Sequence, residues 1–273
     1  MFPGATVDRE AASYVVVGAP LDVTTTFQPG TRFGPDHIRR FAESYDDYDH
    51  RTDRQFTELS VHDAGDIRAW DDVAEYCDYL GGQLRDIVWD GAVPLLLGGE
   101  HTVTVPAVEA VAPDVFVCLA AHLDLREAYD GNAWSHACVT RRVLETVDEA
   151  IILGARTGSE AEWERAEEDD VTVVPPEDID DWLVDPPAFD DRSAYLSVDI
   201  DAADPGFAPG TGTMEPFGLT PQQLRGVVRT VGPHCDGFDV VEVNDRDNGQ
   251  AAALAGKLLR EFVFSHSVAV DDI

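Results

Sequence analysis

Lysine is almost absent from this 273-residue chain, because Lys257 is the only one and every other basic residue is arginine. Acidic residues outnumber basic ones by 53 to 19, which leaves a formal net charge of -34. A nucleic-acid backbone would meet a repulsive surface, so we expect no nucleic-acid partner. The acids are spread along the whole chain, and acid enrichment with lysine loss is typical of proteins from salt-rich cytoplasms. We interpret the charge as the solvent adaptation of a halophilic protein rather than as a functional acidic patch.

Cysteine is scarce, and long apolar runs are missing. The four cysteines form no C-x-x-C pair and are too few for a disulfide scaffold, so we expect free buried thiols at Cys77, Cys118, Cys138 and Cys235. No apolar run approaches the ~20 residues of a membrane span, and the opening MFPGATVDRE has neither a basic start nor an apolar stretch. We therefore expect a cytoplasmic protein without a membrane partner.

Short apolar and β-branched runs recur along the chain, each long enough for one strand. They begin at residues 14, 58, 93, 115, 149, 171, 193 and 238. Helical patterns follow from residues 71, 135, 158, 220 and 248, and Thr220-Pro221 is typical of a helix start. Strands that alternate with helices predict an α/β fold. We expect a three-layer α/β/α sandwich with a mostly parallel sheet of about eight strands.

No internal repeat, low-complexity tract or Gly/Ser linker divides the sequence, so residues 1–273 are predicted to form a single domain. Hydrophobic residues make up 44% of the chain, which is enough for a substantial core. The acidic, proline-bearing stretch 175–191 is the best candidate for an irregular surface loop.

Polar residues that closely follow apolar strands are the candidates for a functional site, because ligands of an open α/β sheet bind at the carboxyl ends of its strands. His101 follows LLLGGE, His122 and Asp124 follow CLAA, and Asp199 and Asp201 end the run LSVDID. Each residue alone also fits an ordinary turn or core role. Together, three carboxylates would repel one another unless a cation joined them, and mixed His and Asp ligands suit a divalent ion such as Mn(II). The pattern therefore predicts a metal site.

Three segments resemble the signatures of the ureohydrolases, the arginase and agmatinase family. They are LGGEHTVTVPAVEA, AHLD and SVDIDAADPGFAPGTGTMEPFG, and weaker similarity extends over nearly the whole chain. The resemblance implies an arginase-like fold, a homo-oligomer (trimer or hexamer), and hydrolysis of a guanidino compound to urea and an amine by a metal-bridging hydroxide. It also implies two Mn(II) ions. One ion would be bound by His101, Asp124 and Asp199, and the other by His122, Asp199 and Asp201.

The same resemblance gives roles to two further residues. Glu242, in VEVN, matches the family carboxylate that pairs with the guanidinium, and His136, in WSHA, matches the position that passes protons to the leaving amine. Without the resemblance, Glu242 reads as a surface acid at a strand end and His136 as an unpartnered residue at a helix start.

The loop REAYDGNAWSHACVTRR is closer to the agmatinase type than to the arginase type. It favours agmatine, converted to putrescine and urea, as the small-molecule substrate. Arginine, guanidinobutyrate and formiminoglutamate remain as alternatives.

One expected ligand is missing from the second signature. The family pattern is D-A-H-x-D, and its first position is Ala120 in this chain. By the resemblance that carboxylate bridges both ions, so its loss removes a ligand from each and a negative charge that offsets their repulsion. The alanine is either introduced, or natural in a paralogue that has lost hydrolysis, or compensated by water and another acid that leave weak activity. We expect a hydrolytic site with far lower metal occupancy and turnover than an Ala120→Asp variant. The rival hypothesis is a non-catalytic ureohydrolase-like binding or regulatory protein.

Overall fold

The computed structural model describes residues 1–68 and 70–271. Its main sheet is formed by β1 (Tyr14–Ala19), β4 (Val61–Asp66), β5 (Val93–Gly98), β6 (Val115–Leu119), β7 (Glu149–Leu153), β8 (Val171–Val174), β9 (Ala194–Asp199) and β10 (Cys235–Val241). The order across the sheet is β4-β1-β5-β10-β9-β6-β7-β8, and all neighbouring strands are parallel. A small antiparallel pair joins β2 (Tyr48–Asp49) and β3 (Arg54–Gln55). The described strands thus match the eight apolar runs of the sequence.

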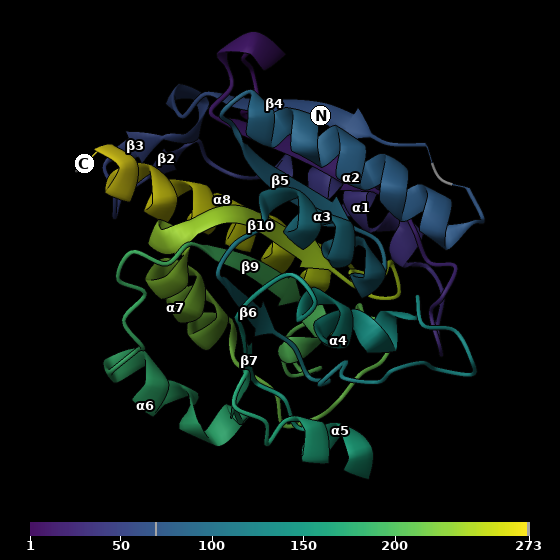
Figure 1. Ribbon diagram of the computed structural model, residues 1–273. Coiled ribbons are helices and arrows are strands. Elements are labelled where there is room, and N and C mark those ends of the chain that lie inside the picture. Colours follow the sequence, from purple (N-terminus) through teal and green to yellow (C-terminus); the bar gives the residue numbers. More distant parts are fainter. Residues whose placement is uncertain (69, 272–273) are drawn as a thin grey trace.

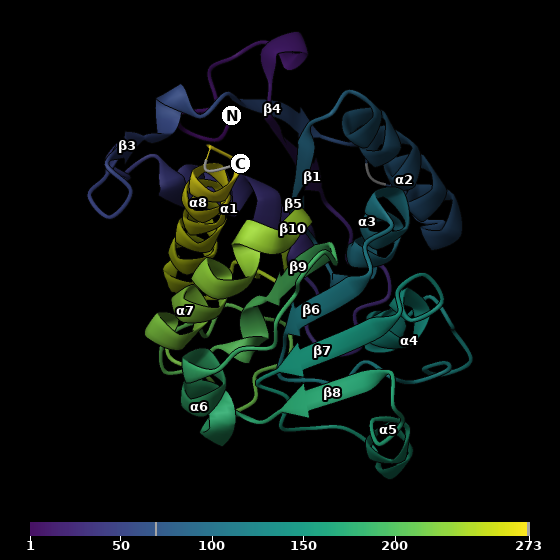
Figure 2. The same ribbon diagram turned by 60° about the vertical axis from the view of Figure 1, so that its left-hand side comes forward.

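Helices cover both faces of this sheet (Figure 1). They are α1 (Gly34–Ala42), α2 (Val73–Trp89), α3 (Thr104–Val111), α4 (Val139–Val143), α5 (Glu160–Arg165), α6 (Ile179–Val184), α7 (Pro221–Val231) and α8 (Gln250–Asp271). Figure 2 shows α2, α3, α4 and α5 on one side of the sheet and α1, α6, α7 and α8 on the other. The predicted three-layer α/β/α sandwich is confirmed.

Alternating side chains of the strands fill two apolar layers, one against each set of helices. In β1, Val15 and Val17 belong to the cluster that includes Leu80 of α2, whereas Val16 belongs to the cluster that includes Phe262 of α8. A parallel sheet covered on both faces needs such continuous apolar strands, because successive side chains point to opposite faces.

The predicted helix start at Thr220-Pro221 is confirmed in detail. Thr220 and Gln223 form a capping box, in which each side chain bonds to the other residue's backbone N–H. All four cysteines are buried and free, as predicted. In the described part of the chain, no helix has the length and apolar character needed to cross a bilayer.

The expectation of an irregular loop over residues 175–191 is wrong in part. This stretch contains α6, whose Ile179 is fully buried and whose Trp182 and Leu183 pack against the same core cluster. These three apolar residues have the i, i+3, i+4 spacing that lets one face of a short helix pack against a core, but the surrounding acidic residues make this pattern hard to recognise. Helices α1 and α3 are further elements that the sequence pattern did not predict.

The sheet order explains where a site can form. Strands β5, β10, β9 and β6 are neighbours at the centre of the sheet, although they are far apart in sequence. Their carboxyl ends all point the same way because the strands are parallel. The residues that follow each of them are therefore brought to one edge.

Candidate active site

His101, Asp124 and Asp199 meet at this edge of the sheet. His101 begins the 3-10 helix η4 (His101–Val103) shortly after β5, and Asp199 is the last residue of β9. His101 Nδ1 lies 3.0 Å from Asp124 Oδ2 and 3.4 Å from Asp199 Oδ2. All three residues are buried.

His122 and Asp201 complete the group on its other side. His122 Nδ1 lies 2.7 Å from Asp201 Oδ2, and the backbone N–H of Ala121 donates to Asp201 Oδ1 at 2.8 Å. The backbone N–H of Asp201 in turn donates to Asp199 Oδ1 at 2.9 Å. The five residues singled out by the sequence thus lie together, as the strand-end reasoning predicted.

Burial and charge strongly perturb these groups. Burial raises the pKa of Asp199 well above its usual range, and repulsion from Asp201 and Glu242 acts in the same direction. Burial also acts to raise the pKa of Asp201, but the adjacent His122 outweighs it, and the pKa falls to about 2. Burial lowers the pKa of His122, yet the charge of Asp201 prevails and raises it to about 9. When all three carboxylates are ionised, their negative charge therefore exceeds what the two histidines can balance, and the raised pKa of Asp199 reflects this.

The chemistry of these donors suits a divalent cation. Carboxylate oxygens and imidazole nitrogens are ligands for ions such as Mn(II), and an added positive charge would relieve the repulsion at Asp199. Among residues 1–68 and 70–271, no three His, Cys, Asp or Glu side chains are already arranged to hold an ion. Here the histidine Nδ1 atoms face carboxylates directly at 2.7 to 3.0 Å, so an ion would replace these hydrogen bonds.

A buried hydrogen-bond chain orients His101 from behind. Ser197 Oγ donates to Asp239 Oδ1 at 2.6 Å and lies 3.2 Å from His101 Nε2. Tyr195 donates its hydroxyl proton to Asp239 Oδ2 at 2.9 Å. Because the single Ser197 proton goes to Asp239, Ser197 Oγ accepts from His101 Nε2–H, and Nδ1 is the nitrogen that would offer its electron pair to an ion in place of its hydrogen bond to Asp124.

Glu242 and His136 form a second group beside the first. Glu242 Oε1 accepts a hydrogen bond from the backbone N–H of His101 at 2.8 Å and lies 2.9 Å from His136 Nδ1. Burial lowers the pKa of His136, but Glu242 more than compensates and raises it to about 9. Glu242 is only 4% exposed, so it is not the surface acid of the alternative interpretation.

Two of the site residues have strained backbones. Asp124 has a φ of 52° and Glu242 a φ of 60°, in the left-handed region that side-chain-bearing residues seldom adopt. Such strain persists only where the surrounding structure enforces it, and it is concentrated at functional sites. Glu242 directly follows β10 and Asp124 lies five residues after β6, and both carboxylates contact the group.

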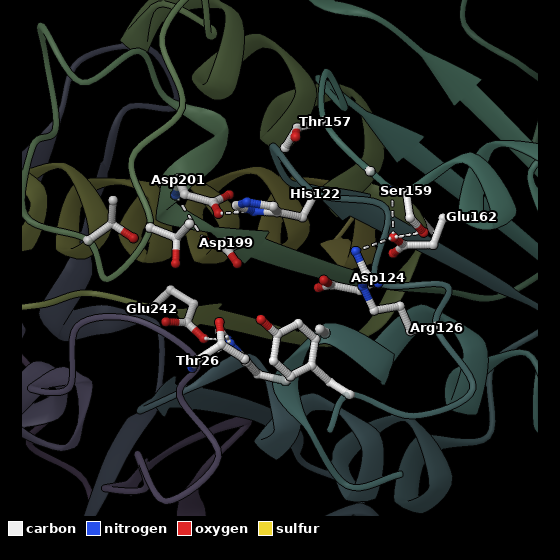
Figure 3. A pocket seen from close by; sticks show the side chains of 16 residues that line it. Thr26, His122, Asp124, Arg126, Thr157, Ser159, Glu162, Asp199, Asp201 and Glu242 are labelled. Carbon is white, nitrogen blue, oxygen red and sulfur yellow. Dashed lines mark hydrogen bonds and ion pairs between the residues drawn. The ribbon is translucent and has the colours of Figure 1, made fainter. Parts of the chain in front are cut away.

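These residues line a cavity of about 240 Å³. Figure 3 shows Asp199, Asp201 and Glu242 towards one end of it and Arg126, Ser159 and Glu162 towards the other. Arg126 Nη2 lies 3.0 Å from Glu162 Oε2, and Ser159 donates to the same oxygen through its N–H at 2.8 Å and its hydroxyl at 2.7 Å. The cavity therefore has an acidic end and a far end closed by an ion pair.

Comparison with known proteins identifies this arrangement. Residues 12–265 match the arginase family. The chain belongs to the arginase family. It is 34% identical to an agmatinase from Pyrococcus horikoshii over 260 residues, which cover 93% of this chain and 92% of that protein. It is also 36% identical over 260 residues to an N(1)-aminopropylagmatine ureohydrolase from Thermococcus kodakarensis, with 93% and 90% covered.

Solved structures place this arginase-family chain in the same group. The crystal structure of an agmatine ureohydrolase from Thermoplasma volcanium superposes with a TM-score of 0.92 at 33% identity, and the match covers 99% of this chain and 95% of that one. The fold, the family and the resemblance to agmatinase predicted from the sequence are thus confirmed. Within the arginase family, the chain resembles agmatinases.

The departure at Ala120 is visible in this family member. Ala120 follows β6 directly, is 1% exposed, and groups with apolar residues such as Cys118 and Val139. The next backbone N–H, that of Ala121, donates to Asp201, so residue 120 lies one peptide away from the acidic group. A methyl group therefore stands one peptide away from Asp201, at the position where the sequence resemblance led us to expect a carboxylate.

Several residues near the site were not predicted from the sequence. Arg126 and Tyr129 lie in the loop that pointed to agmatinase, but nothing in that loop indicated which of its side chains face the cavity. A special role for Asp239 could have been predicted from the sequence, because an acid inside the apolar run FDVVEVN must be paired or neutral when it is buried. Glu100 immediately precedes His101 and is fully buried, where burial raises its pKa to about 7.

Proposed function

We propose that this protein hydrolyses agmatine to putrescine and urea with the help of Mn(II). The observation that carries the proposal is the convergence of His122, Asp124, Asp199 and Asp201 beside Glu242 in one cavity, with His101 directly behind Asp124 and Asp199. Five such side chains from three distant stretches have no structural need to meet there, and their unbalanced negative charge calls for a cation.

Each residue then has a defined task. His101, Asp124 and Asp199 would hold one ion, and His122, Asp199 and Asp201 the other, with Asp199 shared. Mn(II) supplies Lewis-acid activation of water and charge stabilisation when bound. Glu242 offers its carboxylate to the planar guanidinium, and burial strengthens that pairing. His136, hydrogen-bonded to Glu242, is placed to pass a proton to the departing amine.

The names of the related proteins favour agmatine over other guanidino compounds as the substrate. The two curated relatives are named for agmatine and for aminopropylagmatine, both of which carry amines rather than a carboxylate beyond the guanidino group. Guanidinobutyrate is the alternative that Arg126, at the far end, would support.

Ala120 sets the expected level of activity. Each ion retains three protein ligands, which is the number that catalytic metal sites commonly use, but the shared bridging charge is lost. We propose weak Mn(II) binding and slow turnover rather than none. A non-catalytic protein that keeps one ion or no ion is the second candidate, and Ala120 is the observation that favours it.

Metal content and urea release test these two functions together. The protein is purified with Mn(II) in molar salt, its metal content is measured by elemental analysis, and urea is assayed with agmatine, arginine and guanidinobutyrate. About two ions per chain and release of urea from agmatine support the hydrolase. One ion or none, with no urea from any substrate at high enzyme concentration, supports the binding protein. His122→Asn is the control, because it removes a ligand without adding charge.

We also propose a homo-oligomer, a trimer or a hexamer, as the resemblance implies. Light scattering coupled to size exclusion in molar salt would test it, and a monomer across the accessible concentration range would exclude it.

A further inference from the structure

The segment between β1 and the 3-10 helix η2 (Thr31–Phe33) holds His136 by contacts that the tasks above do not require. The backbone N–H of Thr26 donates to His136 Nε2 at 3.1 Å, and the Thr26 hydroxyl lies 3.0 Å from the same nitrogen. On the other side of the ring, Nδ1 lies 2.9 Å from Glu242 Oε1. Figure 3 shows Thr26 and Glu242 next to each other at the cavity wall. Both nitrogens of the imidazole are therefore engaged.

A buried carboxylate anchors this segment. Glu100, which is fully buried, accepts from the N–H and from the hydroxyl of Thr24, each at 2.8 Å. Thr24 Oγ1 accepts in turn from the backbone N–H of His136 at 3.0 Å. The position of Thr26 relative to the imidazole is thus fixed from the core, two residues away.

The direction of these bonds determines where the imidazole keeps its proton. A backbone N–H can only donate, so the nitrogen it points to must offer an electron pair, and the ring proton must be on Nδ1, towards Glu242. We propose that Thr26 is a positioning residue that holds the neutral His136 imidazole as the tautomer protonated at Nδ1, with the Nε2 electron pair accepting from the Thr26 N–H. This inference rests on the proposed function, because it gives His136 its starting state in the reaction.

Opposing forces act on the ring. Glu242, Glu100 and Asp124 are the acidic groups around His136, and all of them favour a second proton on it. The only place for that proton is Nε2, where the Thr26 N–H points. A hydrogen bond to the neutral form disfavours the charged form, so Thr26 opposes the acids. His136 would then enter the reaction as a proton acceptor, and would carry a proton to the amine only after collecting one at Nε2.

Nitrogen NMR of the full-length protein tests the proton state directly. The His136 ring signals are assigned by their loss in His136→Asn, and their ¹⁵N shifts are followed from pH 7 to 10. Above the protonation midpoint, the expected result is one protonated nitrogen, Nδ1, and one unprotonated nitrogen, Nε2. A neutral ring with its proton on Nε2, or a ring that stays doubly protonated up to pH 10, would overturn the inference. This measurement needs no turnover, so failure of urea release contradicts the proposed function while leaving this result intact.

Variants separate the N–H of Thr26 from its hydroxyl. Thr26→Pro removes the N–H, and we expect the protonation midpoint of His136 to rise by about one pH unit, a tenfold gain in proton affinity. Thr26→Val keeps the N–H and should leave the proton on Nδ1. Thr25→Ala is the matched control, because the Thr25 hydroxyl contacts Glu100 and not His136. A midpoint unchanged in Thr26→Pro would contradict the role of Thr26, and if that variant does not fold, the shifts of the natural chain and of Thr26→Val decide.

Discussion

Restoring a carboxylate at residue 120 should have opposite effects with and without metal. Ala120 is 1% exposed and lies beside Asp201, so Ala120→Asp places a further negative charge in an already acidic, buried group. Without a cation, an unpaired buried charge costs about 3–5 kcal/mol. We therefore expect the metal-free variant to unfold at lower denaturant concentration than the natural chain.

With Mn(II) bound, the added carboxylate should stabilise the protein instead of destabilising it. A carboxylate about 4 Å from a dication gains roughly 8 kcal/mol at an effective dielectric constant near 20, which exceeds the burial cost by about 3–5 kcal/mol. The burial cost is already present in the metal-free folded variant, so the full gain of roughly 8 kcal/mol acts on the affinity. Each 1.4 kcal/mol corresponds to about a tenfold change, so Mn(II) should bind up to about 10⁵–10⁶-fold more tightly to Ala120→Asp. Urea release from agmatine should rise with metal occupancy.

Calorimetric titration of Mn(II) and a urea assay measure both effects, and Ala120→Asn is the matched control. The amide has nearly the same shape as the acid but no charge, so it should lower the stability of the metal-free protein slightly and leave Mn(II) affinity nearly unchanged. Equal Mn(II) affinity and equal urea release for the natural chain and for Ala120→Asp would refute the reasoning.

Three further predictions concern the surroundings of the site. Ser197→Ala removes the acceptor of His101 Nε2–H and should weaken Mn(II) binding about 10–100-fold by calorimetry. In chelator-treated protein, the His122–Asp201 pair should contribute its full stabilisation of the fold at pH values below 6.5, the ordinary histidine pKa. This stabilisation should be lost as the pH rises towards about 9, and denaturation at several pH values measures it. Arg126→Ala removes a positive charge from the far end of the cavity, so the KM for agmatine should fall about tenfold while that for guanidinobutyrate rises.

Each of these has an outcome that would count against it. Unchanged Mn(II) affinity in Ser197→Ala would mean that the buried chain does not orient His101. A flat stability profile from pH 6.5 to 9 would mean that the His122–Asp201 pair contributes nothing to folding. A proportional change of both KM values in Arg126→Ala would indicate a general distortion of the cavity, and Arg126→Lys, which keeps the charge, serves as its control.

Much of the fold was predictable because its signals are local. Eight apolar runs separated by helical patterns are sufficient to indicate a parallel sheet covered on both faces, and the capping box at Thr220 marks a helix start from adjacent residues alone. Helix α6 was missed because its acidic composition outweighed its three apolar anchors. A short helix depends on tertiary packing, which the local pattern does not contain.

The sequence by itself determined the residue types at the strand ends and their pairing along the chain, since His122 with Asp124 and Asp199 with Asp201 are separated by two residues. It also has Ala120 where the resemblance leads us to expect an acid. Only the tertiary structure decided which partners meet across the sheet, such as Asp239 behind His101 and Thr26 against His136, which are separated by 138 and 110 residues. Contacts of this kind arise from the strand order β5-β10-β9-β6 and from loop paths over the sheet edge. Local sequence patterns cannot predict these long-range contacts, because the topology depends on chain entropy and on the packing of the whole core.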